Sequence, residues 1–221
     1  MPSGKYTFYL HNDDRTDLLV AATFDGISQP LRGDFLRTAA IAGGVLYRTD
    51  TRLPALITEL FSGKMHAAQI IFLTAALAGG RPAVSSTGDA RWPLCRWQEE
   101  EHPENYERRR MTLQLPAEDI TVTLLETVPS RLRGQVIRQF ITTGCALHTV
   151  DQRLPRLLAN LPVPPESPEG LVALLEEMAG QPETQTPACP LQGGSAHVPV
   201  NKQDSTTASS DRLRQNMKKI F

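Results

Sequence analysis

The sequence predicts a mainly helical fold with one two-stranded antiparallel ribbon, built from two copies of a strand–helix–helix unit, with extra helices and a disordered C-terminal tail. Two observations support this prediction. A pattern of thirty residues occurs twice, at 31–60 and 132–161, and a short segment of alternating apolar and polar residues precedes each copy. A repeat of this length is one structural unit used twice, so we expect a symmetric dimer joined into one polypeptide.

The two copies of the pattern align without a gap, and 12 of their 30 positions are identical. Composition alone would produce roughly two identities over such a length. Gly43 and Gly44 lie inside a helical pattern, so their expected role is close helix packing. The identical pairs include Arg32/Arg133, Gly33/Gly134, Arg37/Arg138, Gly43/Gly144 and Asp50/Asp151, and an Arg-Leu-Pro segment follows in each copy.

In the first repeat, residues 5–11 alternate between polar and apolar side chains, as in a strand with one buried face. Ser28 is expected to cap a long helix that has Pro30 in its first turn. The first predicted helix of this repeat follows a candidate N-cap at residues 12–14 and ends at about Gly26. The other predicted helices cover about 30–47, 53–61 and 66–78.

The second repeat follows the same order. Residues 110–115 form the predicted strand, and Pro116 ends it. Ser130 is expected to cap the long helix, as Ser28 does in the first repeat. The predicted helices of this repeat cover 118–127, 130 to about 148, 154–160, and 168 to about 178.

Composition changes along the chain predict five segments. Residues 180–209 are rich in Pro, Gln, Thr, Ser and Gly, and such a segment buries too little apolar surface to offset its ordering entropy. The predicted organisation is a first unit at 5–78, a linker at 79–108, a second unit at 109–179, a disordered stalk at 180–209 and an amphipathic tip at 210–221.

The C-terminal tip has apolar residues at helical spacing with basic residues around them. An amphipathic tip after a disordered stalk is a usual form of a partner-binding motif. The residues expected to bind a partner are Leu213, Met217, Lys218, Lys219, Ile220 and Phe221.

The formal net charge of the chain is -1, but the charge is uneven. Residues 109–161 and 210–221 each carry +3, and a basic region of this kind suits an anionic partner. Three cysteines without close spacing argue against a disulfide framework or a zinc site, and no motif for a metal or another cofactor is present. No apolar run reaches 18 residues and no signal-peptide core is present, so we expect no membrane association and a cytoplasmic location.

The polar face of the predicted ribbon is the candidate site for reading DNA bases. A two-stranded ribbon fits the major groove of B-DNA, where Lys and Arg suit guanine, Gln suits adenine, and Thr suits either edge or a thymine methyl group. The outward residues are Lys5, Thr7 and Tyr9 on one strand and Arg110, Thr112 and Gln114 on the other.

The start of the second helix in each repeat is a candidate phosphate site. Free N–H groups and the helix dipole favour an anion there, so these positions would hold the DNA backbone on either side of the ribbon. Arg37 and Arg138 lie farther along these helices and are expected to form structural or inter-unit salt bridges. The candidate phosphate residues are Ser28, Arg32, Ser130, Arg131 and Arg133.

These residues resemble a known family, the ParR/StbB plasmid-partition adaptors, which are ribbon-helix-helix proteins. The resemblance covers residues 5–60 and is most specific at Leu36–Pro54, which is similar to the family pattern Leu-x-Arg-Ala-Ala-Leu-x-x-Gly-x-x-Leu-Tyr-x-x-Asp-x-Arg-x-Pro. The segment 214–220 also resembles the terminal Asn-Ala-Met-Lys-Leu-Ile segment of the family. This chain departs from the family by carrying two units instead of one.

The resemblance implies a DNA-binding adaptor in the bacterial cytoplasm. Such adaptors bind repeated centromere-like sites in double-stranded DNA, self-associate there into a ring or helical arc, and repress their own operon. Their C-terminal ends bind an actin-like ATPase of the ParM type, whose filament pushes plasmid copies apart. The fused units imply half as many C-terminal tails for each DNA site.

Two other classes of protein are alternatives to the adaptor. An enzyme is not expected, because the chain has no Walker-type phosphate loop and no G-x-G-x-x-G, H-E-x-x-H or G-x-S-x-G motif. A ribbon-helix-helix repressor or an antitoxin stays the alternative, since an antitoxin also joins a DNA-binding head to a disordered tail. The short tip after a long stalk and the extra helices of each repeat favour the adaptor.

Overall fold

The ribbon is formed by two strands from distant parts of the chain. In the computed structural model, which describes residues 4–79 and 107–180, β1 (Lys5–His11) pairs antiparallel with β2 (Arg108–Gln114). Thr7 lies opposite Thr112. A rotation that exchanges the two strands leaves this pair in place and moves the Lys5–Gln114 pair onto the Tyr9–Arg110 pair. The Thr7–Thr112 pair therefore marks a pseudo-two-fold axis.

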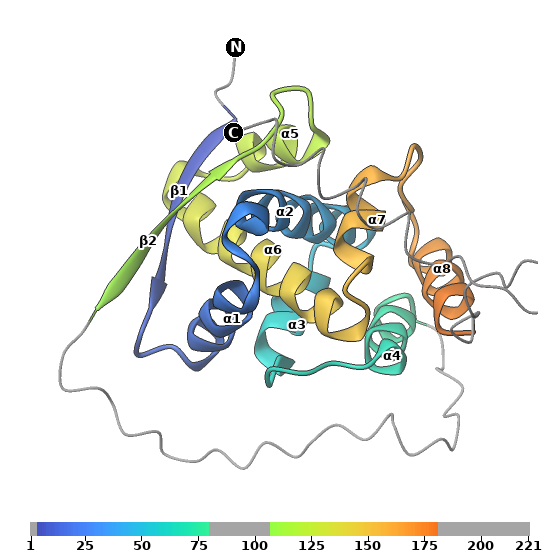
Figure 1. Cartoon of the computed structure of the whole chain (residues 1–221). Helices are drawn as coiled ribbons and strands as arrows, with labels where there is room; N and C mark the ends of the chain where they lie inside the picture. The colour runs from blue at the N-terminus through green and yellow to red at the C-terminus, as the bar shows by residue number, and fades with distance from the viewer. Residues whose placement is uncertain (1–3, 80–106, 181–221) are drawn as a thin grey trace, which may run out of the picture. The chain divides into compact units, whose positions relative to one another are not determined.

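Helices follow the two strands in the same order in both units. The first unit has α1 (Arg15–Gly26), a short 3-10 helix (Gln29–Leu31), α2 (Arg32–Thr49), α3 (Leu53–Leu60) and α4 (Ala67–Leu77). The second unit has α5 (Ile120–Thr127), α6 (Ser130–Val150), α7 (Leu154–Asn160) and α8 (Pro168–Gly180). The predicted fold class is therefore confirmed: helices predominate, and the ribbon is two-stranded and antiparallel (Figure 1).

The first helices of the two units differ by one turn. The prediction for the second unit was wrong here, because α5 begins at Ile120 and not at Glu118. Asp119 sets this start, since its carboxylate accepts a hydrogen bond from the Thr121 N–H at 2.8 Å. In the first unit, Asp14 caps α1 by accepting from the N–H groups of Thr16 and Asp17.

The two long helices, α2 and α6, cross at the centre of the fold. Gly43 and Gly144 lie at this crossing, and a β-carbon on either would be 2.4 Å from a Cα atom of the other helix. Close helix packing, the predicted role of Gly43, is therefore confirmed. Cys145 follows the second of these glycines and is fully buried, and burial raises the pKa of its thiol to about 12.

The two units exchange elements and share one core. The third helix of each unit packs on the long helix of the other, α3 on α6 and α7 on α2, and α4 packs on α8. β1 likewise contacts α6, while β2 contacts α2. The inner face of the ribbon, which includes Phe8 and Leu113, is buried in this core. One hydrophobic cluster therefore contains residues of both repeats, and all described residues belong to one compact unit.

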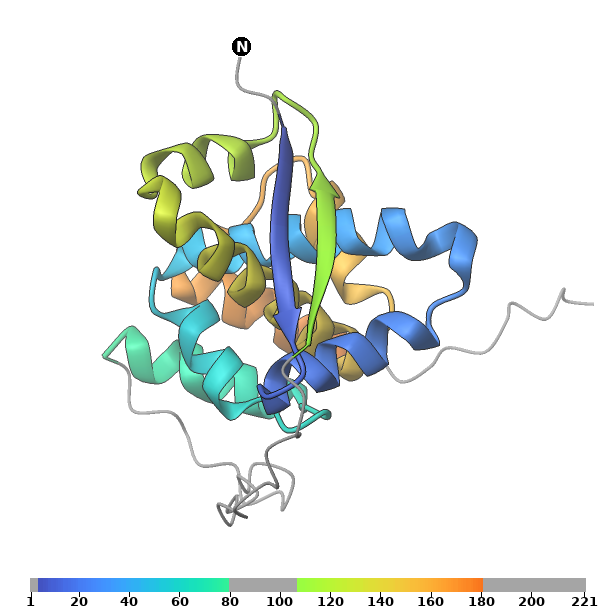
Figure 2. The same ribbon diagram turned by 90° about the vertical axis from the view of Figure 1, so that its left-hand side faces the viewer.

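The opposite face of the ribbon is turned away from the core. Figure 2 looks onto this face, and none of the helices in the described ranges covers it. The predicted tip, and almost all of the predicted linker and stalk, lie outside the described residues.

Candidate nucleic-acid interface

The six residues predicted to read bases lie on the outer face of the ribbon. Alternation along each strand causes this, because the side chains between them are buried in the core at Tyr6 and Phe8 of β1 and at Met111 and Leu113 of β2. Tyr9 is half-buried and the other five are exposed. Across the ribbon the register pairs Lys5 with Gln114, Thr7 with Thr112, and Tyr9 with Arg110. Their role in reading bases stays a prediction.

Sequence reasoning missed Arg108 on this face. The strand β2 begins at Arg108, two residues before the predicted start, so Arg108 and Arg110 share the outer face. The guanidinium group of Arg108 lies over the Tyr9 ring, 4.9 Å from its centroid, which is the geometry of a cation–π contact. The alternation in the run Arg-Arg-Arg at 108–110 was the signal that could have revealed it.

Arg109 lies on the inner side of the same run and has a structural role. It is opposite Leu10 in the ribbon. Its guanidinium group donates two hydrogen bonds to the Asp25 carboxylate, at 2.9 and 3.0 Å, and lies over the Phe24 ring. This bidentate pair lowers the pKa of Asp25 and ties β2 to the C-terminal end of α1.

Ser28 occupies the predicted N-cap position, with Pro30 in the turn that follows, but the helix that begins there is the short 3-10 helix before α2, and the Ser28 side chain makes no capping hydrogen bond. The predicted Ser130 cap was wrong. Ser130 is the first residue of α6, because Pro129 occupies the capping position. Both serines, and Arg131 beside the second, are exposed at the helix starts. Phosphate binding by these three residues stays a prediction that rests on exposure and the helix dipole.

Arg32 and Arg133, also predicted to bind phosphate, have equivalent contacts inside the chain. The Nε of Arg32 donates to the Ile27 carbonyl at 2.9 Å, and that of Arg133 donates to the Val128 carbonyl at 3.0 Å. In each, Nη2 donates to a second carbonyl two residues earlier. These bonds satisfy carbonyl groups at the ends of α1 and α5, so both arginines hold the turn before the long helix.

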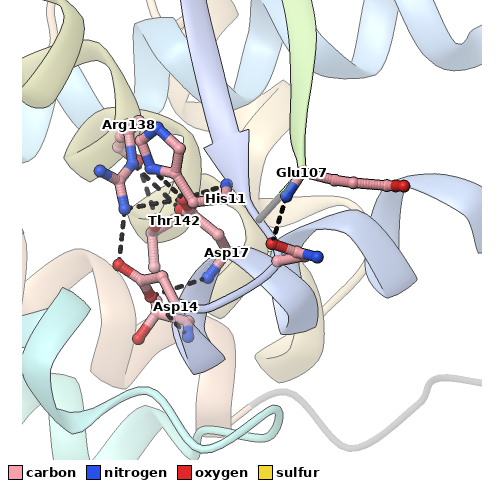
Figure 3. A network of polar contacts seen from close by, with 8 residues as sticks. His11, Asp14, Asp17, Glu107, Arg138 and Thr142 are labelled. Atoms are coloured by element: carbon pink, nitrogen blue, oxygen red, sulfur yellow. Dashed lines mark hydrogen bonds and ion pairs between the residues drawn. The ribbon is translucent and has the colours of Figure 1, made fainter. Parts of the chain in front are cut away.

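A network of polar side chains joins the units beside the ribbon (Figure 3). Arg138 of α6 donates from Nη2 to Asp14, at 2.7 Å, and from Nε to Asp17, at 3.0 Å. The backbone N–H of His11 donates to Asp17 at 2.8 Å. Burial raises the pKa of the Asp17 carboxyl, and these two donors oppose that rise. Arg138 is therefore an inter-unit salt-bridge group, as predicted.

The duplicated Asp-x-Arg segment forms the same closed turn in both units. The Asp50 carboxylate accepts from the Arg52 backbone N–H at 2.8 Å and from its guanidinium Nη2 at 2.8 Å. Asp151 accepts from the same groups of Arg153, at 2.7 and 2.9 Å. The guanidinium bonds lower the pKa of both carboxyls. The aspartate and arginine are therefore the same in both repeats because they close the turns before α3 and α7.

Within residues 4–79 and 107–180, no group of three or more His, Cys, Asp or Glu side chains is placed to hold a metal ion. Over the same part of the chain, every helix is too short or too polar to cross a membrane.

The fold and the outer face of the ribbon define a class of protein: a ribbon-helix-helix pseudo-dimer fused into one chain. The family model of the plasmid stability proteins matches residues 4–74 and 109–175, which together are more than half of the 221 residues. The chain belongs to this family, and its function is related to plasmids. The match in two segments agrees with the duplicated unit. No curated protein and no solved structure matches the chain significantly.

Proposed function

We propose that this chain is the DNA-binding adaptor of an actin-type plasmid segregation system. It binds double-stranded, centromere-like DNA repeats through the outer face of the ribbon and self-associates along them. Its C-terminal tip binds an actin-like ATPase filament, and the chain also represses its own operon. The nucleotide chemistry belongs to the filament, so the adaptor itself is not an enzyme.

The outer face of the ribbon is the observation that carries this proposal. A two-stranded antiparallel ribbon fits the width of the major groove. The face presents Lys5, Arg108 and Arg110 together with the neutral hydrogen-bonding groups of Thr7, Thr112 and Gln114. Cations supply affinity for the phosphate backbone, and the neutral groups can discriminate between base edges.

The two strands differ in the residues that they offer to DNA. The pseudo-two-fold axis relates Lys5 to Arg110 and Tyr9 to Gln114, so only the central threonines are the same. A homodimer would present identical strands, whereas this fused pair can prefer an asymmetric site.

The C-terminal part of the proposal depends on sequence alone. The tip at 210–221 lies outside the described residues, and its apolar and basic residues suit a groove on a partner protein. The family assignment supports a plasmid-related partner. Membrane binding is not part of the proposal.

A footprint of the purified protein on the DNA that flanks its own gene tests the proposal. Protection of several short repeats in phase with the DNA helix is the expected result, because an adaptor assembles on an array. Protection of a single short operator would instead favour a repressor or an antitoxin. No protection at any salt concentration would refute the ribbon as a DNA-binding surface.

A further inference from the structure

We propose that the two sides of the ribbon hold DNA phosphates at different positions: at Arg37 on the side of α2, and at Arg131 on the side of α6. The chain would then bind DNA with a fixed polarity, although its fold is nearly symmetric. This inference rests on the proposed DNA-binding function and adds a residue, Arg37, that was expected to have only a structural role.

Two grooves flank the ribbon at equivalent places. The first lies between β2 and the start of α2, has a volume of about 520 Å³ and is lined by Thr112, Gln114, Gly33 and Arg37, among others. The second lies between β1 and the start of α6, has a volume of about 510 Å³ and is lined by the equivalent residues Thr7, Tyr9, Gly134 and Arg138, among others. Each groove therefore adjoins the base-reading face, where a phosphate backbone would pass.

Arg138 is not available to a phosphate in the second groove. Its guanidinium group is held by Asp14 and Asp17, and the Asp17 side chain is only 2% exposed. Glu59 of α3 also lines this groove, so Asp14, Asp17 and Glu59 give the surroundings of Arg138 a negative charge. Since carboxylates repel phosphate groups, DNA phosphates are disfavoured at this position.

The extra turn of α1 causes this difference between the grooves. Asp14 caps α1 and Asp17 lies in its first turn, and α5 is shorter by one turn. The first groove has Leu115 and Pro116 in the corresponding place. Arg37 instead pairs with Asp34 of its own helix, and the two side chains are 46% and 39% exposed. An exposed pair of this kind contributes little, so a phosphate can displace Asp34 from Arg37.

The second side has its cation at a different position. Arg131 is exposed at the start of α6, and the equivalent residue before α2 is Pro30. Arg131 lies seven residues before Arg138, which is about 10 Å along a helix. The contacts on the two sides are thus displaced by about this length relative to the pseudo-two-fold axis. Arg32 and Arg133 contribute no polarity, since their hydrogen bonds to backbone carbonyl groups are equivalent in both units.

The salt dependence of DNA affinity tests this inference with matched variants. The plot of log K against log salt has a negative slope, and one lost phosphate contact makes it less steep by about 0.9. Arg37→Ala and Arg131→Ala are each expected to reduce the steepness by that amount, whereas Arg138→Ala leaves it unchanged in protein that circular dichroism shows to be folded. Equal slopes for Arg37→Ala and the unsubstituted chain would overturn the inference, as would an equal loss for Arg138→Ala.

Ethylation interference provides a second measurement that does not depend on the folding of Arg138→Ala. Arg37→Ala should abolish interference at a phosphate on one side, close to the centre of the site. Arg131→Ala should abolish it on the other side, farther from the centre. If the two phosphates lay at equal distances from the centre of the DNA site, the inference would be overturned, although DNA binding would stay established. An unsubstituted chain that binds no DNA would remove the proposed function, and this inference with it.

Discussion

Gly43 of α2 lies so close to the main chain of α6 that a β-carbon there would be 2.4 Å from the Phe140 Cα atom. Gly144 has the equivalent relationship to Ala39. The packing of the core around the pseudo-two-fold axis therefore depends on two positions without a side chain.

Gly43→Ala is expected to lower the free energy of unfolding by about 1–3 kcal/mol, because the new methyl group forces the two helices apart. Urea denaturation measures this change. Gly33→Ala in the same helix is the matched control, since a β-carbon there meets nothing within 4 Å. We expect this control to be neutral or to gain up to about 1 kcal/mol from helix propensity. Equal effects of the two substitutions would refute the packing argument.

Thr121→Val is expected to stabilise the protein. The Thr121 side chain is fully buried in α5, and its hydroxyl has no hydrogen-bond partner among the described residues. Valine has the same shape without the polar group, so we expect a gain of about 1 kcal/mol in the free energy of unfolding. Thr143→Val is the control, because that buried hydroxyl donates to the Gln139 carbonyl at 2.8 Å. A gain in the control equal to that of Thr121→Val would contradict this explanation.

Much of the fold followed from the repeat and from its periodicity. Twelve identities in thirty positions placed the long helices, and alternation in 5–11 and 110–115 placed the ribbon with its polar face outward. These features depend on spacing along the chain, which a sequence shows directly. The packing role of Gly43 could be predicted for the same reason.

The side-chain partners of the candidate site could not be predicted in this way. Phosphate binding by Arg32 and Arg133 stays a prediction, and the sequence did not show that both also hold carbonyl groups at the ends of the preceding helices. That contact depends on how the chain turns between the helices, and a pattern of residue types does not specify this. The pairing of Arg138 with Asp14 also depends on the first turn of α1, which has no counterpart in the second unit, where α5 begins at Ile120.

The Asp50–Arg52 turn is expected to make stability depend on pH in the acidic range. Its bonds lower the pKa of Asp50 in the folded state, so the turn stabilises the protein fully above the ordinary carboxyl pKa of about 4. This stabilisation is lost as the pH falls through the lowered value. The melting temperature of Asp50→Asn should therefore be below that of the unsubstituted protein at pH 7, and the difference should shrink towards pH 2. A difference in melting temperature that stays constant between pH 7 and pH 2 would contradict a contribution from the ion pair. The control is Asp13→Asn, at an exposed position.

Lys5→Ala or Arg110→Ala is expected to weaken specific DNA binding by about 1–3 kcal/mol, because each removes a cation from the outer face of the ribbon. Titration of one labelled site at fixed salt measures the loss. Lys64→Ala is the matched control, since Lys64 is exposed in the loop between α3 and α4, beside Leu175 and away from the ribbon. If all three variants bound as tightly as the unsubstituted chain, the reading surface would have to lie elsewhere.

Deletion of residues 210–221 is expected to abolish binding to the actin-like filament and to leave DNA affinity unchanged. The tip carries Leu213, Met217 and Ile220 at helical spacing, so their apolar side chains can form one face against a groove of the partner. Co-sedimentation with filaments and titration of labelled DNA measure the two activities separately. The full-length control replaces these three residues with serine and keeps the basic ones. If this control still bound the filament, the contact would depend on the basic residues of the tip. Equal loss of filament binding and DNA binding in the deletion variant would refute the assignment of filament binding to the tip.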